Sequence, residues 1–187
     1  SQRPINQKWS WDRILRSPYI KQADILQGFY MFEDNFSTEE LERHFDFYEP
    51  FTVHESSLSP CVHSIQAAKL DRMEQAYAFY LRTSRLDLDD YNHEVEEGLH
   101  ITSMAGTWMS IVEGFGGMRV LNNTLSFTPK IPKGWKSFSF KVNFRNQIIT
   151  VNVTQKGTHF ELKGKQEFSI LVNGEKVIVS PNNLITI

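Results

Sequence analysis

Between residues 21 and 113, the apolar side chains recur every three or four positions, which is the period of helices with one buried face. In residues 21–32, for example, Ile25, Leu26 and Phe29 fall on one stripe. The same spacing continues through four later segments, separated by short polar stretches. We therefore expect five helices, in the pattern of stacked antiparallel pairs, over residues 21–32, 37–48, 59–70, 71–86 and 98–118.

Residues typical of helix ends flank these segments. Ser37 is followed three positions later by Glu40, the pattern of a capping box in which each side chain accepts a backbone N–H. We expect Ser59 to cap the third helix, with Pro60 in its first turn, where proline is favoured. Three glycines are expected to end the last helix: Gly114, Gly116 and Gly117.

After Asn122 the apolar residues recur every second position, which indicates strands. Phe138 and Phe140 alternate with polar neighbours, Arg145–Asn146 marks a turn, and Asn173–Gly174 is a strong signal for a tight hairpin. We expect strand structure over residues 138–144, 148–154, 160–164 and 168–180.

The two periods together predict an α+β fold. The helical part is expected to occupy residues 1–122, and an antiparallel β-sheet or small sandwich is expected to occupy residues 123–187. The connector FTPKIPKGWK, with two prolines and a glycine, precedes the first long strand. Because no initiator methionine stands before Ser1, we expect the chain to be a piece of a longer polypeptide.

The composition narrows the class of protein. The 187 residues are 40% hydrophobic and 22% charged, with a net charge of -2, whereas a dedicated nucleic-acid binder carries a basic face. No apolar run is long enough to cross a bilayer, so we expect neither a nucleic-acid nor a membrane partner. With Cys61 as the single cysteine, no internal disulfide can form, and we expect a reducing, cytoplasmic location. The histidines lack the spacing of zinc ligands, so we expect no metal site.

The stretch FTVHESSLS, residues 51–59, gathers hydroxyl groups immediately before a predicted helix. The unpaired N–H groups of a helix start attract anions, and Ser56 and Ser57 would add donors to such a site. The alternative is that Ser59 caps the helix and the other two serines lie in an ordinary loop. Spacing alone favours the cap.

Two further stretches carry candidate binding residues. His100 lies at the start of the last predicted helix, where Gly106 allows close backbone approach. A histidine there would hold an oxyanion, unless it is a core histidine satisfied by a neighbouring carbonyl. Lys21 and Gln22 offer long, adaptable donors suited to sugar hydroxyls, unless they are a solvated first turn.

Taken in order, the segments IKQADILQ, TVHESSLSPCVHSIQAAKL and EGLHITSMAGTW resemble glycoside hydrolase family 65, the inverting disaccharide phosphorylases that include maltose, trehalose and kojibiose phosphorylases. The likeness spans roughly residues 17–117. It implies that the helices are the last ones of an (α/α)6 barrel and that the strands form the small β domain after it. The general-acid glutamate of the family lies upstream of Lys21, so the resemblance implies no catalytic residue in this chain and no activity for the chain alone.

The resemblance also implies roles for five residues. Lys21 and Gln22 match the pair that contacts the glucose ring on the non-reducing side of the scissile bond. Ser56 and Ser57 match the phosphate-binding serines, and His100 matches the histidine that reaches phosphate. Inorganic phosphate is then the co-substrate and a disaccharide the other partner. We expect no further cofactor, and we expect the whole protein to be a homodimer.

The implied reaction is cleavage of an α-glucosyl disaccharide by inorganic phosphate, with inversion, to give β-glucose 1-phosphate, and maltose is the favoured substrate. An inverting hydrolase activates water with a second carboxylate. Phosphate is already an anion, so it needs donors that hold it, and Glu55 should point away from it.

Two alternatives remain open. One is a hydrolase of the same family acting on α-glucosides. The other is a non-catalytic fragment whose sheet binds carbohydrate or a partner domain. Trp135 and Phe138 are the local hint for the second alternative, although we expect them to pack the sheet against the helices.

Overall fold

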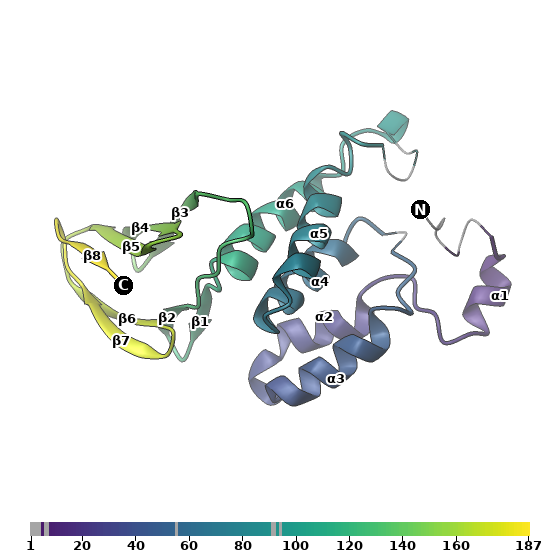
Figure 1. Cartoon of the computed structure of the whole chain (residues 1–187), viewed down its shortest axis with the longest axis horizontal. Coiled ribbons are helices and arrows are strands. Elements are labelled where there is room, and N and C mark those ends of the chain that lie inside the picture. Colours follow the sequence, from purple (N-terminus) through teal and green to yellow (C-terminus); the bar gives the residue numbers. More distant parts are fainter. Residues whose placement is uncertain (1–4, 6–7, 55, 91–92, 94) are drawn as a thin grey trace. The chain divides into compact units, whose positions relative to one another are not determined.

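The computed structural model describes the chain except for residues 1–4, 6–7, 55, 91–92 and 94. It divides into two compact units, Ser1–Ser110 and Ile111–Ile187. The first unit carries the α-helices and the second carries the strands (Figure 1). The α+β class predicted from the sequence is therefore confirmed. No helix among the described residues is long and apolar enough to cross a membrane.

The described part of the helical unit contains α1 (Trp11–Leu15), α2 (Asp24–Met31), α3 (Thr38–Tyr48), α4 (Ser59–Lys69), α5 (Met73–Ser84) and α6 (Ile101–Met109). The last five correspond to the five predicted helices. The sequence analysis missed α1, because five residues are too few to show a helical period; the Ser10 side chain caps it by accepting the Arg13 N–H. The 3₁₀ turns η2 (Glu33–Asn35) and η3 (Val95–Glu97) lie in two of the connections, and α6 passes directly into a π-helical turn, η4 (Ser110–Phe115).

The central helix of this unit is α4. All of its residues from Ser59 to Ala68 are buried, and it packs against α2, α5 and α6. Its buried polar side chains bond to the backbone of neighbouring helices. The Ser64 hydroxyl donates to the Ala76 carbonyl at 2.9 Å, and the Gln66 amide donates to the Leu26 carbonyl at 2.5 Å. These bonds fix α4 relative to α5 and α2, because a buried donor left without a partner is costly.

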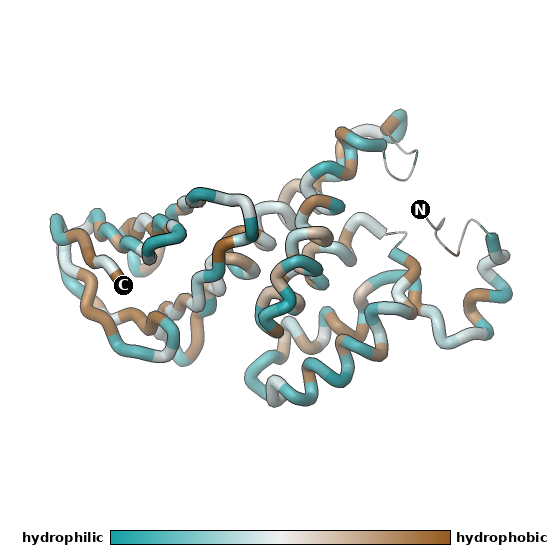
Figure 2. Tube along the Cα trace, viewed as in Figure 1, coloured by the Kyte–Doolittle hydropathy of each residue, from teal (hydrophilic) through white to brown (hydrophobic). Residues whose placement is uncertain are grey.

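The helix α3 lies at the surface of the same unit. It is largely hydrophilic (Figure 2), and only Leu41 and Phe45 of it are buried. Arg72, just before α5, forms ion pairs with Asp46 and Glu42 of α3. The Arg72 guanidinium holds the pKa of the Asp46 carboxyl below its usual value. A small apolar stripe and the ion pairs of Arg72 therefore attach α3 to the rest of the helical unit.

The predicted helix ends are confirmed at α3 and corrected at α4. The Ser37 hydroxyl accepts the Glu40 N–H, and the Glu40 carboxylate accepts the Ser37 N–H, so the capping box is present. The prediction that Ser59 caps α4 is wrong. Ser59 is the first helical residue, and its hydroxyl accepts the Ala23 N–H at 3.0 Å, a tertiary contact that local spacing does not reveal. Pro60 lies in the first turn, as predicted.

The strand unit contains two four-stranded sheets. The first has the order β1-β2-β6-β7, formed by Arg119–Leu121, Thr124–Phe127, Phe168–Val172 and Glu175–Val179. The second has the order β3-β4-β5-β8, formed by Ser137–Phe144, Gln147–Thr154, Gly157–Lys163 and Leu184–Thr186. Side chains of both sheets share one core, in which the Phe127 ring centre lies 5.3 Å from Phe160 and 6.3 Å from Phe140. The predicted small sandwich is therefore confirmed.

Three strands and one pairing were not predicted. The strands β1, β2 and β8 have only three or four residues, too few to show alternation. The strands β2 and β6 run parallel, with Ser126 opposite Leu171 and Phe127 opposite Val172, so the mostly antiparallel sheets also contain a parallel pairing. The chain builds β3, β4 and β5 before β6 returns to the first sheet, and such a long connection permits parallel pairing.

Both predicted hairpin turns are confirmed. Between β3 and β4, Arg145 and Asn146 have φ angles of 52° and 59°, and between β6 and β7, Asn173 and Gly174 have φ angles of 51° and 85°. Positive φ at both central residues defines the type I′ turn, whose twist matches that of the flanking strands. Asparagine and glycine tolerate this conformation best.

The division between the two units falls at the end of α6, ahead of the change of period after Asn122. All residues of η4 after Ser110 belong to the strand unit. Val112 belongs to the strand core, and the Phe115 ring centre lies 5.6 Å from Trp135 and 6.4 Å from Phe138. Trp135 and Phe138 therefore pack against Phe115 of η4 within the strand unit.

The close approach of α6 to α4 yields a testable prediction. A Cβ added at Gly106 would lie 2.7 Å from Cβ of Cys61 and 3.0 Å from its Sγ. We expect Gly106→Ala to lower the free energy of unfolding by about 1–3 kcal/mol, because both helix backbones are fixed there. The matched control is Gly28→Ala in α2, where a Cβ meets nothing within 4 Å. The control should raise stability by about 0.5–1 kcal/mol. Urea unfolding measures both changes, and equal effects would contradict the close contact.

Candidate functional site

The loop before α4 is held by contacts at both of its ends. The His54 backbone has a φ of 58°, and its carbonyl accepts the Arg82 guanidinium at 2.7 Å. The Leu58 N–H donates to the Ser56 hydroxyl at 3.2 Å. The expectation for Glu55 lies outside the described residues. These contacts hold His54 and Leu58, on either side of Glu55.

Two hydrogen bonds join this loop to the start of α6. The hydroxyls of Ser57 and Thr102 lie 3.3 Å apart, and the Ser103 hydroxyl donates to the Ser57 carbonyl at 3.2 Å. The amino ends of α4 and α6 therefore meet at Ser57. A helix start carries a partial positive charge, so the place where two helix starts meet favours an anion. Of the two predicted phosphate serines, Ser57 lies at this meeting point.

His100 immediately precedes α6 and is held by Asp87. The Asp87 carboxylate accepts the His100 backbone N–H at 3.0 Å and contacts the ring Nδ1 at 2.6 Å. The His100 interaction holds the pKa of the Asp87 carboxyl below its usual value. The His100 Nδ1 therefore meets a carboxylate, and 22% of the side chain is exposed. The structure places His100 at the same helix start as Thr102 and its partner Ser57.

The sequence analysis did not find Asp87. It lies in the segment LDLDD, which offers three similar aspartates, and no local pattern distinguishes one of them. A carboxylate thirteen residues before a histidine is not a recognised motif. The contact between Asp87 and His100 is therefore evident only in the folded chain.

The segment that holds Lys21 and Gln22 lies beside the loop before α4. On one side of the pair, Ile20 donates its N–H to the Phe51 carbonyl at 2.9 Å and accepts the Val53 N–H at 2.8 Å. On the other side, the Ala23 N–H reaches the hydroxyl of Ser59, the first residue of α4. The predicted sugar-binding pair therefore lies along the same loop as the predicted phosphate serines.

The two side chains of this pair differ in their contacts. The Lys21 ammonium lies 5.5 Å from the centre of the Trp11 ring, and the Gln22 amide donates to the Asp24 carboxylate at 3.0 Å. Lys21 is exposed, and Gln22 is half-buried. Both residues lie just before α2, in agreement with the predicted helix start. Their polar groups are near the surface.

Two histidines are buried beneath the loop. The ring centres of His54 and His63 lie 4.6 Å apart, and His63 Nδ1 bonds to the Ser59 carbonyl at 2.8 Å. Burial lowers the pKa of His54, with the Glu49 carboxylate 3.8 Å away acting in the opposite direction. Burial and the neighbouring His54 lower the pKa of His63 to about 3. Both rings are therefore neutral at pH 7, and they support the loop by packing.

This buried pair predicts a loss of stability in acid. A histidine with a lowered pKa takes up a proton on unfolding below about pH 6.5, so the free energy of unfolding falls as pH falls from 6.5 toward 3. We expect His63→Gln to remove up to about 1.4 kcal/mol of this decrease per pH unit. Urea unfolding at several pH values measures the slope in the variant and in the wild type, and identical slopes would contradict the buried pair.

No group of three metal-ligating side chains occurs within the described ranges. Cys61 is buried, and its thiol lies 3.2 Å from the Leu58 carbonyl at the start of α4. A thiol in this position packs between helices, as expected from its apolar surroundings.

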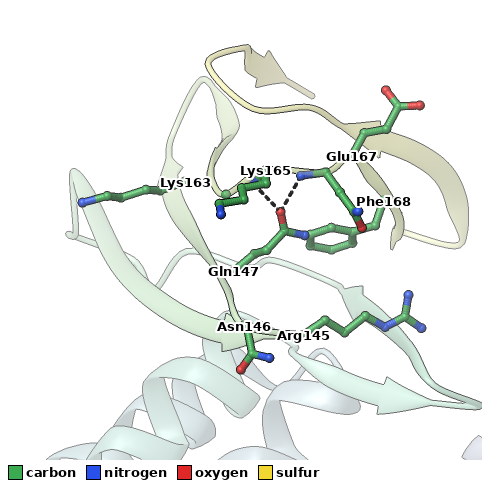
Figure 3. Close-up of a pocket in the computed structure, with 9 residues that line it drawn as sticks. Arg145, Asn146, Gln147, Lys163, Lys165, Glu167 and Phe168 are labelled. Carbon is green, nitrogen blue, oxygen red and sulfur yellow. Dashed lines mark hydrogen bonds between the residues drawn. The ribbon is translucent and has the colours of Figure 1, made fainter.

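The strand unit has a separate concavity of about 590 Å³, in which no predicted site residue lies. The side-chain amide oxygen of Gln147 accepts the backbone N–H groups of Lys165 and Gln166, each at 2.8 Å, and so fixes the loop after β5 (Figure 3). The side chains of Lys163 and Arg145 point in opposite directions (Figure 3). The cations of this concavity therefore do not converge on one point.

Two family sequence models match the chain. The glycosyl hydrolase family 65 central catalytic domain matches residues 1–109, and the glycosyl hydrolase family 65 C-terminal domain matches residues 118–179. The chain therefore belongs to glycosyl hydrolase family 65, as the sequence motifs implied.

The similar proteins carry the names of several phosphorylases. Maltose phosphorylase of Bacillus subtilis is 56% identical over 96% of this chain, and alpha,alpha-trehalose phosphorylase of Thermoanaerobacter brockii is 38% identical over 97%. A solved structure, "Putative kojibiose phosphorylase from human microbiome", superposes with a TM-score of 0.90 at 42% identity and covers 98% of this chain. The chain spans 24% and 23% of the two relatives and 27% of the solved chain.

Proposed function

We propose that this chain is part of an inverting disaccharide phosphorylase that cleaves an α-glucosyl disaccharide, maltose being favoured, with inorganic phosphate to give β-glucose 1-phosphate. Membership of glycosyl hydrolase family 65 supports the class, and the similar proteins are named as phosphorylases of different sugars. The 56% identity to a maltose phosphorylase favours maltose. The observation that carries the proposal is the junction of two helix starts at Ser57, beside His100.

In the proposed site, phosphate is held by donors. The hydroxyls of Ser56 and Ser57, N–H groups at the starts of α4 and α6, and the His100 ring bind its oxygens. Hydrogen bonds to an anion are about twice as strong as those between neutral groups. Phosphate attacks the anomeric carbon directly, so no second carboxylate is needed to activate water, in contrast to an inverting hydrolase.

Lys21 and Gln22 are proposed to bind the glucose ring on the non-reducing side of the scissile bond. Their segment runs beside the phosphate loop through the bonds of Ile20 and Ala23, so a sugar held there would adjoin the phosphate. Amide and ammonium groups donate readily to sugar hydroxyls.

The remaining parts of the proposal concern the whole protein. The helices of this chain are proposed to be the last ones of an (α/α)6 barrel, and the general acid is proposed to lie upstream of Lys21. The chain alone is then inactive. The whole protein is proposed to be a cytoplasmic homodimer that uses inorganic phosphate as its co-substrate and needs no other cofactor.

The reaction class can be tested on the full-length polypeptide that carries this chain. We expect incubation with maltose and inorganic phosphate to release glucose 1-phosphate, with less or no product from trehalose and kojibiose. An enzymatic assay for glucose 1-phosphate measures the product, and reactions without phosphate are the control. Glucose released equally without phosphate would mean a hydrolase and would overturn the proposal. Phosphate-dependent product from another disaccharide would keep the class and change the substrate.

The phosphate site can be tested with Ser57→Ala in the same polypeptide. Losing one hydrogen bond to a charged group costs about 1.5–3 kcal/mol, so the KM for phosphate should rise about 10- to 100-fold. The KM for the disaccharide should change little. The control is Ser84→Ala, whose hydroxyl bonds to the Leu81 carbonyl at the end of α5. An unchanged KM for phosphate in a folded Ser57→Ala variant would contradict the assignment.

A further inference from the structure

The hydroxyl of Thr102 lies beside that of Ser57, although no sequence pattern marked Thr102 as a binding residue. The two oxygen atoms are 3.3 Å apart, and the residues are 45 positions apart in the chain. Thr102 is exposed in the first turn of α6, and Ser57 is half-buried in the loop before α4. A second hydroxyl group therefore accompanies Ser57, which is one of the proposed phosphate ligands.

Backbone contacts, rather than the hydroxyl pair itself, keep the two side chains close. Ser103, the residue after Thr102, is 2% exposed, and its hydroxyl donates to the Ser57 carbonyl at 3.2 Å. Because its β-carbon is branched, threonine adopts few χ1 rotamers in a helix. The Thr102 hydroxyl therefore stays near that of Ser57 even when the two do not bond to each other.

The contact between the two hydroxyls is weak enough for an anion to replace it. Hydrogen bonds between hydroxyl groups usually measure about 2.5–3.0 Å, and the 3.3 Å contact is longer. Each hydroxyl has one proton, which can turn about the C–O bond. Both protons can therefore turn toward an anion beside the pair, whose charge makes each new bond about twice as strong as one between neutral groups.

We propose that Thr102 is a further phosphate-binding residue, whose hydroxyl donates to the same anion as the Ser57 hydroxyl. Phosphate carries several strong acceptor oxygens, so two neighbouring donors can bind one anion together. The proposal rests on the proposed function of Ser57. The alternative is that Thr102 acts only through Ser57, by holding the serine hydroxyl in place.

The first test replaces Thr102 in the full-length polypeptide that carries this chain. Thr102→Val keeps the shape of the side chain and removes its hydroxyl, so the KM for phosphate should rise about 10- to 100-fold, with little change in the KM for the disaccharide. Thr102→Ser keeps a hydroxyl and should retain most of the affinity. The matched control is Thr107→Val in the same helix, whose hydroxyl donates to the Ser103 carbonyl at 2.9 Å, and its KM for phosphate should match the wild type.

The second test separates direct binding from an effect through Ser57. It compares Ser57→Ala with the double variant Ser57→Ala/Thr102→Val by kcat/KM for phosphate, which can be measured even when phosphate does not saturate the enzyme. If Thr102 binds the anion itself, the double variant should have a kcat/KM at least about 10-fold below that of Ser57→Ala. If Thr102 acts only through Ser57, the two values should be equal, and this result would overturn the proposal.

The outcomes also separate this proposal from the proposed function. An unchanged KM for phosphate in Thr102→Val, together with a raised KM in Ser57→Ala, would overturn the role of Thr102 and leave the phosphate site intact. Unchanged values in both variants would remove the proposed phosphate site as well. A loss in Thr102→Ser as large as that in Thr102→Val would also contradict the proposal, because the loss would not then depend on the hydroxyl. Circular dichroism checks that each variant is folded.

Discussion

The hydrogen bonds between Ser57 and the first turn of α6 are the interaction on which the candidate site depends. The Ser103 hydroxyl and the Ser57 carbonyl join a loop to a helix that lies more than forty residues later in the chain. Without this link, the starts of α4 and α6 would each be an ordinary helix end. With it, two partially positive helix starts and the hydroxyls of Ser57, Thr102 and Ser103 share one location, which suits an anion more than either helix end does alone.

The groups around this junction are neutral where they support the loop and charged where they contact His100. Beneath the loop, His54 and His63 are neutral because burial lowers their pKa values, so packing and not charge supports the backbone there. Beside the loop, Asp87 places a full negative charge against His100. The negative charge beside the junction is therefore held by the residue that precedes α6.

The sequence predicted the elements better than their contacts. Helical periods identified α2 to α6, and the hairpin residues identified the turns of the second unit, because these signals are local. The prediction that Ser59 caps α4 is wrong because the Ser59 hydroxyl accepts the N–H of Ala23, which belongs to a distant segment of the chain. The parallel pairing of β2 with β6 depends on the order of all the strands, which no local pattern reveals. The candidate serines and His100 came from motifs that resemble a family. Asp87 came from no motif, since only folding brings it to His100.

The central claim is that an anion binds where α4 and α6 begin. The most direct measurement is a titration of the ¹⁵N-labelled chain with inorganic phosphate, followed by the backbone amide signals. Binding at both helix starts predicts saturable shifts that are largest at Ser57 and Leu58 and, with the same dissociation constant, at Thr102 and Ser103. Shifts confined to one helix start, or largest at the loop after β5, would contradict it.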